Sequence, residues 1–266
     1  MTKLRDKRLF LLDMDGTLYI GDRLFDGVPE FLRHVRSMGG RYLFLTNNSS
    51  RGVEGYIEKL RRLGIESAPG DYLTSVDAAI DHLRRFHAGE KCYVFGTRAF
   101  YGQLQTAGIP VTDRPEDDVD ILLCGFDREL TFRKLEDACI LLNRGVTWLA
   151  TNPDWVCPTW YGSVPDCGSV CRMLTTATGR KPLFLGKPQP AMAELALRRT
   201  GFSPEQAVII GDRLYTDVAC GINAGIDSIF VLSGEGTEAD IAQYGIHPTW
   251  IFSDIAALYR QLEETL

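Results

Sequence analysis

Short runs of consecutive apolar residues recur along the chain, and they alternate with stretches in which apolar positions repeat every three or four residues. The apolar runs lie at residues 8–12, 42–46, 92–95, 119–124, 146–150, 183–185, 207–211 and 228–232. Runs of this length without polar alternation are typical of strands in parallel sheets that are covered on both faces. We therefore predict a short parallel strand at each of these positions.

Helical periodicity fills the segments between these runs. Residues 28–39 (VPEFLRHVRSMG), 54–64 (EGYIEKLRRLG) and 190–201 (PAMAELALRRTG) are amphipathic, and each ends on a glycine, the residue that most often terminates a helix. A chain in which strands alternate with such helices predicts an α/β fold. The expected form is a Rossmann-like, doubly wound parallel sheet.

The alternation of strand and helix occurs twice, which indicates two modules. Residues 77–182 contain their own predicted strands and helices and are long enough to form a separate domain. We therefore predict a core made of residues 1–76 and 183–266, with an α/β module at 77–182 inserted between its two parts. No linker-like composition marks the junctions.

Composition narrows the class of protein. Of 266 residues, 45% are hydrophobic and 24% are charged, which is ordinary for a globular domain. The net charge of −6 argues against a nucleic-acid polymer as partner, because such surfaces are usually basic. The chain has neither an apolar run long enough to span a bilayer nor the apolar core of a signal peptide near its start. We expect a soluble cytoplasmic protein with no membrane partner.

The seven cysteines are an odd number and show no CxxC spacing. In a chain of this length they are interpreted as reduced, mostly buried thiols. Cys157, Cys167 and Cys171 lie close together in the sequence and could bind a metal, but no tetrahedral pattern of nitrogen and sulfur ligands accompanies them.

Two carboxylates follow the first predicted strand, in Asp13-Met14-Asp15-Gly16-Thr17. Alternate residues of a strand point to the same side, and Gly16 permits a tight turn after them. Two like charges so close together repel unless a cation or a proton compensates. The pair therefore predicts either ligands for a hard cation such as Mg²⁺ or a nucleophile beside a proton donor.

Polar residues also follow the second strand, in Thr46-Asn47-Asn48-Ser49-Ser50. Hydroxyl and amide groups at a strand end are suited to binding an anion. The alternative is that they cap the next helix, a position in which Ser and Asn are also favoured.

Two further motifs follow later strands. Lys187 lies between Gly186 and Pro188, an unusual place for a solvated lysine, where it could neutralise a phosphate or an aspartate. Asp212 ends the strand at 207–211 and is a natural metal ligand. Asp217 would either begin or cap the following helix, or orient that ligand set.

Taken in order, DxDGT, TN, K and GDxxxTD resemble the motifs of the haloacid dehalogenase (HAD) superfamily, in its phosphatase branch. The longer segments FLTNNSSR, LATNPDWVCP, GKPQPAM and GDRLYTDVACGINAG are similar to those of subfamily IIA, which includes NagD-type and p-nitrophenyl phosphatases. The resemblance implies that the inserted module is a C2-type cap.

The resemblance also implies roles for individual residues. Asp13 would be the nucleophile that forms an aspartyl phosphate, and Asp15 the general acid and base. Thr46, Asn47 and Lys187 would bind the phosphoryl group. Mg²⁺ would be held by Asp13, Asp212 and the backbone carbonyl of Asp15, with Asp217 in support.

Polar and aromatic residues of the inserted module could face the leaving group, with packing inside the module as the alternative. The candidates are Asn152, Asp154, Trp155, Trp160 and Tyr161. Pro165-Asp166-Cys167-Gly168 departs from the Pro-Gly-x-Gly common in the subfamily and leans toward its NagD-type members.

The predicted function is that of a Mg²⁺-dependent phosphomonoester hydrolase acting on a nucleoside monophosphate, a sugar phosphate or a cofactor phosphate. The alternatives are a catalytically idle module that senses a phosphorylated ligand, and a phosphotransferase. A homodimer is compatible with the family.

Overall fold

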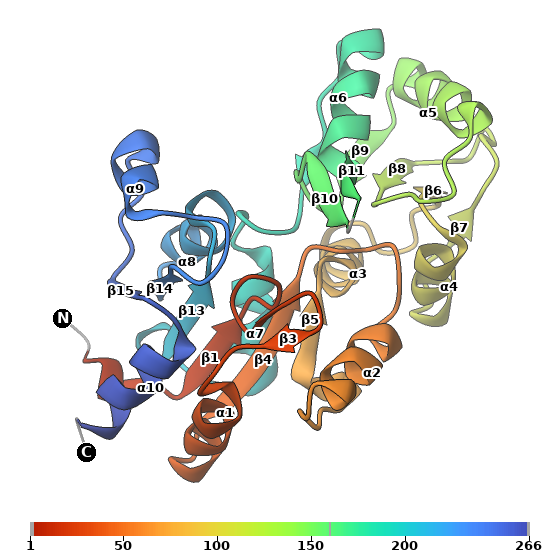
Figure 1. Cartoon of the computed structure of the whole chain (residues 1–266). Helices are drawn as coiled ribbons and strands as arrows, with labels where there is room; N and C mark the ends of the chain where they lie inside the picture. The colour runs from red at the N-terminus through yellow and green to blue at the C-terminus, as the bar shows by residue number, and fades with distance from the viewer. Residues whose placement is uncertain (1–2, 160, 265–266) are drawn as a thin grey trace. The chain divides into compact units, whose positions relative to one another are not determined.

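The computed structural model describes residues 3–159 and 161–264, and the chain divides into two compact units. The core unit consists of the described residues up to Thr46, the segment Val53–Leu73, and the residues from Lys187 onward. The inserted unit consists of Asn47–Gly52 and Thr74–Gly186. Figure 1 shows that each unit is built around its own sheet, and that the core sheet joins the red-orange and blue ends of the chain.

The core sheet has six strands in the order β15-β14-β13-β1-β4-β5. The central strand β1 pairs in parallel with β13 on one side and β4 on the other. All four residues of β1 are buried, as expected for an apolar strand covered on both faces. The strands are β1 (Leu9–Leu12), β4 (Arg41–Thr46), β5 (Tyr72–Thr74), β13 (Ala207–Gly211), β14 (Asp227–Val231) and β15 (Trp250–Phe252).

Amphipathic helices cover the core sheet. In α1, Phe31 packs its ring edge-on against Phe10 of β1, with 5.4 Å between the ring centroids. The helices of the unit are α1 (Val28–Ser37), α2 (Glu54–Arg62), α7 (Ala191–Thr200), α8 (Ala219–Ala224), α9 (Glu238–Tyr244) and α10 (Ile255–Glu263). Short 3₁₀ turns lie at Leu4–Asp6, Pro69–Asp71 and Pro204–Gln206. A π-helical turn spans Leu214–Val218. A small hairpin joins β2 (Tyr19–Ile20) to β3 (Arg23–Leu24).

The inserted unit repeats this plan with five parallel strands in the order β12-β9-β8-β6-β7. The strands are β6 (Cys92–Phe95), β7 (Val111–Thr112), β8 (Ile121–Cys124), β9 (Thr147–Ala150) and β12 (Leu183–Phe184). The helices are α3 (Ser75–Phe86), α4 (Arg98–Thr106), α5 (Phe132–Arg144) and α6 (Cys167–Thr178). An antiparallel hairpin, β10 (Val156–Thr159) with β11 (Gly162–Pro165), precedes α6.

The predicted fold class is confirmed, and each of the apolar runs forms a strand. The strands β5, β7 and β15, which have only two or three residues each, were not predicted from the sequence. Both hairpins were also missed, because their strands are mostly exposed and carry no apolar run.

The division between the units differs from the predicted boundaries at 77 and 182. The inserted unit begins at Thr74, whose hydroxyl accepts a hydrogen bond from the backbone N–H of Asp77 and so caps α3. It ends at Gly186, because Leu185 is buried in the hydrophobic cluster of that unit. The segment Asn47–Gly52, which was expected in the core, also belongs to the inserted unit.

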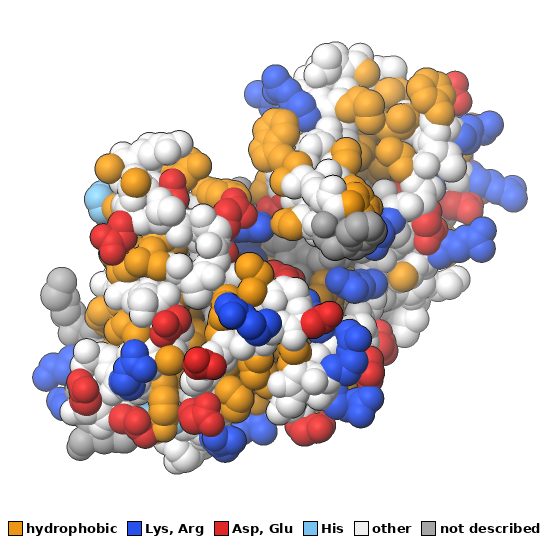
Figure 2. All heavy atoms as spheres, in the orientation of Figure 1, with side chains coloured by type: hydrophobic (Ala, Val, Ile, Leu, Met, Phe, Trp, Pro, Cys, Tyr) orange, Lys and Arg blue, Asp and Glu red, His pale blue; other side chains and the backbone are white. Residues whose placement is uncertain are grey.

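The surface and the cysteines agree with an ordinary globular chain. Figure 2 shows acidic and basic side chains interspersed over the visible face of the core unit, and hydrophobic side chains gathered on part of the inserted unit. None of the seven cysteines, all of which lie in the described residues, forms a disulfide, and Cys92, Cys124, Cys167, Cys171 and Cys220 are buried. Within residues 3–159 and 161–264, no helix combines the length and the apolar character needed to cross a membrane.

Candidate active site

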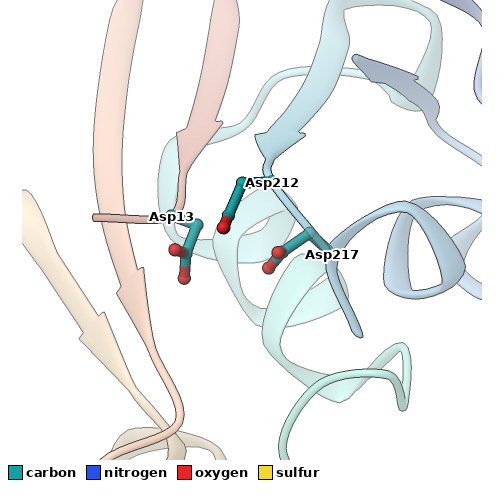
Figure 3. A group of neighbouring side chains, drawn as sticks. All are labelled: Asp13, Asp212 and Asp217. Carbon is teal, nitrogen blue, oxygen red and sulfur yellow. The ribbon is translucent and has the colours of Figure 1, made fainter. Parts of the chain in front are cut away.

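Two adjacent strands of the core sheet bring Asp13 and Asp212 together. Asp13 directly follows β1, and its backbone N–H donates to the carbonyl of Ile210 in β13 at 2.9 Å, which continues the ladder beyond the strand. Asp212 directly follows β13. Because the carboxyl ends of neighbouring parallel strands meet at one edge of a sheet, both carboxylates lie at that edge. Figure 3 shows them turned into the same space as the carboxylate of Asp217.

Lys187 links two of these three carboxylates. Its Nζ lies 2.6 Å from Oδ1 of Asp13 and 2.6 Å from Oδ1 of Asp217. The residue is 2% exposed, so its charge is almost completely withdrawn from water. Asp217 lies inside the π-helical turn and accepts from Lys187, so it does not cap the following helix, which was one of the two interpretations of the sequence.

Glycines are required where the backbone approaches the acids. Gly16 has φ +81°, and a Cβ at this position would lie 2.2 Å from Oδ2 of Asp212. A Cβ at Gly234 would lie 2.0 Å from the same oxygen, and one at Gly211 would lie 2.3 Å from the side chain of Asp217. No side chain fits at such distances, so these glycines leave room for the carboxylates.

Burial and mutual repulsion disturb the titration of the acids. Burial raises the pKa of Asp13 well above its usual range; Lys187 opposes this effect, and Asp217 and Asp212 add to it. Burial, followed by the charge of Asp217, raises the pKa of Asp212 to about 6. Burial alone would lower the pKa of Lys187, but the carboxylates of Asp13 and Asp217 outweigh it and raise that pKa above the ordinary lysine value.

The carboxylates fit a divalent cation. Each of Asp13, Asp212 and Asp217 offers an oxygen within 4.8 Å of the others. Among the described residues, these three carboxylates are the one group of Asp, Glu, His or Cys side chains that lie close enough together to hold a metal ion. Among the same residues, Oδ1 of Asp212 is buried without a hydrogen-bond partner, while its Oδ2 accepts from the backbone N–H of Glu235 at 2.7 Å. A buried carboxylate oxygen without a donor is a natural ligand for a hard cation.

Asp15 lies in a different environment from Asp13. Its side chain is 69% exposed, and Oδ1 lies 3.5 Å from Nζ of Lys59. The hydroxyl of Tyr19 donates to Oδ2 of Asp15 at 3.4 Å, and Nζ of Lys59 lies 3.8 Å from the centroid of the Tyr19 ring. Lys59 and Tyr19 could not be predicted from the sequence, because a lysine in an amphipathic helix and a tyrosine after a turn carry no distinctive signal.

The chain passes from one unit to the other between Thr46 and Asn47. Thr46 ends β4 in the core unit, where its hydroxyl lies 3.4 Å from the hydroxyl of Tyr56. Asn47 belongs to the inserted unit, where its Nδ2 donates to Oδ2 of Asp154 at 3.0 Å. The helix-cap alternative is wrong, because α2 begins only at Glu54 and its N-cap residue is Val53.

The candidate specificity residues occupy different environments. Asn152 is fully buried and donates to the backbone carbonyl of Asn47, which favours the packing interpretation that the sequence left open. Asp154 contacts the side chain of Asn47. Trp155 and Tyr161 are each 61% exposed, and Trp160 lies outside the described residues.

Comparison with known proteins identifies close relatives of the whole chain. Residues 10–110 match the family model of haloacid dehalogenase-like hydrolases, and residues 184–258 match a HAD-hydrolase-like model. An acid sugar phosphatase of Staphylococcus aureus is 31% identical over 261 residues, which cover 98% of this chain and all of the relative.

Solved structures give the same result. A 4-nitrophenylphosphatase from Thermotoga maritima is 36% identical with a TM-score of 0.92, and the match covers 97% of this chain and 98% of that protein. A glycerol phosphate phosphatase from Mycobacterium tuberculosis, in complex with magnesium, is 32% identical with a TM-score of 0.89; the match covers 97% of this chain and 78% of that one. The same phosphatase has also been solved in complex with calcium.

Proposed function

The chain belongs to the haloacid dehalogenase-like hydrolases, in the subfamily of NagD-type and p-nitrophenyl phosphatases, and is a phosphoric monoester hydrolase; on that premise we propose that it hydrolyses small phosphate monoesters with Mg²⁺ through an aspartyl phosphate. Its relatives are named for sugar phosphates, 4-nitrophenyl phosphate and glycerol phosphate, which supports a small substrate. Nucleoside and cofactor monophosphates belong to the same chemical class. A cytoplasmic location and a homodimer stay predictions.

The observation that carries the proposal is the contact of Lys187 with Asp13. A buried ammonium 2.6 Å from a carboxylate favours its ionised form, the form that a nucleophile requires, and so opposes the effect of burial on the pKa of Asp13. The same ammonium would reduce the repulsion between Asp13 and an incoming phosphate dianion. Asp217 would hold Lys187 in place from the other side.

Mg²⁺ would be held by Asp13, Asp212 and the backbone carbonyl of Asp15, with Asp217 in support, and when bound it would neutralise charge on the phosphoryl oxygens. The relative in complex with magnesium supports this choice of ion.

The steps carried by the chain's own residues follow from these positions. A carboxylate oxygen of Asp13 would attack phosphorus, and the bond from phosphorus to the ester oxygen would break. Asp15 would give its proton to that leaving oxygen, and would then take a proton from the water that attacks the intermediate. Inorganic phosphate would leave and Asp13 would be free again. The exposure of Asp15 is suited to proton exchange, and Lys59 would hold its carboxylate in position.

Phosphate release from a panel of small monoesters tests the proposal, with wild type, Asp13→Asn and Asp15→Asn compared in Mg²⁺ and in EDTA. We expect hydrolysis that requires Mg²⁺ and falls at least about 10³-fold in both variants, as is typical when a catalytic side chain is removed. Trapping of a hydroxylamine-sensitive phosphoenzyme from wild type, and its absence from Asp13→Asn, would identify the nucleophile. Binding of a phosphate ester without any release would instead favour the sensor alternative. Release that requires an added alcohol as acceptor would favour a phosphotransferase.

A further inference from the structure

The carboxyl edge of the inserted sheet holds a segment of the chain itself. Ser49 is fully buried; its Oγ accepts from the backbone N–H of Phe126, after β8, at 2.8 Å, and lies 3.0 Å from the hydroxyl of Thr151, after β9. The hydroxyl of Thr97, after β6, donates to the carbonyl of Ser50 at 2.9 Å. Residues that follow three neighbouring strands therefore hydrogen-bond to the segment Asn47–Gly52. They do so at the carboxyl edge, where α/β sheets usually bind a ligand.

Asn47 is held through both its backbone carbonyl and its side-chain amide. Its backbone carbonyl accepts from the hydroxyl of Ser75 at 2.6 Å and from Nδ2 of Asn152 at 2.8 Å. Oδ1 of Asn152 accepts in turn from the backbone N–H of Asp154 at 3.0 Å. With the bond from Nδ2 of Asn47 to Asp154, these contacts form a closed ring of Asn47, Asn152 and Asp154.

The ring also fixes which way the amide of Asn47 faces. An ionised carboxylate only accepts hydrogen bonds, so the NH₂ group of Asn47 must be the end turned to Asp154. The opposite end, Oδ1, lies where a Cβ on Gly186 would be 2.6 Å away, so Gly186 leaves room for the amide oxygen. The NH₂ group has two hydrogens; the bond to Asp154 uses one and thereby sets the direction of the other.

We propose that Asp154, supported by Asn152, is a positioning residue that orients the Asn47 amide for the phosphoryl group, and that it does not select the leaving group. This inference rests on the proposed phosphatase function and on the phosphate-binding role that the sequence resemblance implies for Asn47. It distinguishes two functions for one carboxylate: a residue that orients Asn47 affects every phosphate ester alike, whereas a residue that contacts the leaving group affects each ester differently.

The test compares wild type, Asp154→Ala, Asp154→Asn, Asn47→Ala and the double variant Asn47→Ala/Asp154→Ala. Asp117→Ala is the control, because Asp117 is an exposed acid of the same unit, where it pairs with Arg144. The measurements are kcat and KM for 4-nitrophenyl phosphate, glycerol phosphate and glucose 6-phosphate, and the affinity for inorganic phosphate by calorimetry in Mg²⁺.

We expect Asp154→Ala to lower kcat/KM by roughly tenfold or more, since it removes a charge-assisted hydrogen bond, and by the same factor for all three esters. The affinity for inorganic phosphate, which has no leaving group, should fall in parallel. Asp154→Asn keeps an acceptor for the Asn47 amide and should recover most of the loss. The double variant should be no worse than Asn47→Ala alone, because both changes remove one interaction.

A loss that differs more than tenfold between the esters, with phosphate affinity unchanged, would overturn the proposal and assign Asp154 to the leaving group. Additive effects in the double variant, or wild-type behaviour of Asp154→Ala, would overturn it as well. Failure of the proposed function is distinguishable: wild type would then release no phosphate from any ester. The calorimetry still decides the role of Asp154 in that case, and a wild type that binds no phosphate overturns both.

Discussion

The two sheets of this protein are built by the same rules but use their carboxyl edges in opposite ways. The core edge gathers charge: Asp13, Asp212 and Asp217 lie close together, and the ammonium of Lys187 pairs with Asp13 and Asp217. The inserted edge holds the segment Asn47–Gly52 through hydroxyl, amide and backbone groups. Asp127, which follows β8 there, is already paired with Lys134 at 2.7 Å.

The difference shows that position alone does not make a site. Both edges lie where an open α/β sheet places its ligand. Within the described residues, the core edge brings together three carboxylates and one buried ammonium, an excess of negative charge that a divalent cation would balance. At the inserted edge, polar groups bond to the backbone and side chains of the segment Asn47–Gly52. Substitutions at the core edge should therefore mainly change catalysis, and those that remove the contacts of Ser49 and Ser50 at the inserted edge should mainly change stability.

The largest effect is expected from Lys187→Met, which keeps the length of the side chain and removes its charge. We expect kcat/KM for a small phosphate monoester to fall by about 10²–10³-fold, because a preorganised charge near the phosphoryl oxygens is lost. Stability should also fall, since Asp13 and Asp217 lose a buried counter-charge. Lys181→Met, at an exposed lysine, is the control. Activity within threefold of wild type would contradict the assignment.

Asp212→Asn tests the excess of negative charge at the core edge, and EDTA is added so that no metal ion compensates that charge. The pKa of Asp212 is raised from 3.8 to about 6, so the folded protein binds more protons than the unfolded chain between these values. Wild type should therefore lose stability relative to the variant as pH rises through this window. Above pH 6 the variant should be the more stable by on the order of 2–3 kcal/mol. Thermal unfolding from pH 4 to 7.5 measures this, with the exposed Asp22→Asn as control; a difference independent of pH would refute it.

Ser49→Ala tests the inserted edge. It leaves the buried N–H of Phe126 without its acceptor, which should lower the free energy of unfolding by about 1–3 kcal/mol. Urea unfolding measures the loss, and Ser37→Ala, on the exposed face of α1, should stay within about 0.5 kcal/mol of wild type. If Ser49→Ala strongly lowered activity while the free energy of unfolding stayed unchanged, the inserted edge would have a catalytic role and the distinction between the two edges would be wrong.

The smallest effect is expected from Lys59→Met. Its contact with Asp15 is long and partly exposed, so removing it should lower kcat by only about threefold to tenfold, near 1 kcal/mol. Arg61→Met, on the exposed side of the same helix, should have no such effect. In an Asp15→Asn background, Lys59→Met should change nothing further. An additional loss there would mean that Lys59 acts on something other than Asp15.

The sequence predicted the fold and the core edge well because both depend on long, uniform signals. Apolar runs identified the strands, and the rule that parallel strands end at one edge placed Asp13 and Asp212 together. It could not show which groups pair: the contact of Lys187 with Asp217 joins residues 30 positions apart. Lys59 could not be distinguished from Arg61 or Arg62, since all three lie in one amphipathic helix.

The inserted edge could not be recognised from the sequence for a related physical reason. Thr46 and Asn47 are neighbours in the sequence, yet the structure assigns them to different units. The hydroxyls and amides that hold Asn47–Gly52 are common in every loop, and each bond is decided by a partner far away in the sequence. Ser49 and Thr151, for example, are separated by 102 positions. The catalytic and binding roles of the site residues stay proposals.

The segment Asn47–Gly52 has a consequence for protein engineering. An exchange of modules between related phosphatases would naturally transfer the continuous stretch from Thr74 to Gly186 into a foreign core. Such a chimaera would lack the native segment Asn47–Gly52, which fills the carboxyl edge of the transferred sheet. The corresponding segment of the foreign core would take its place, although its sequence is matched to a different sheet. Grafts that carry Asn47–Gly52 along with the main stretch should fold and assemble where the simple transplant does not.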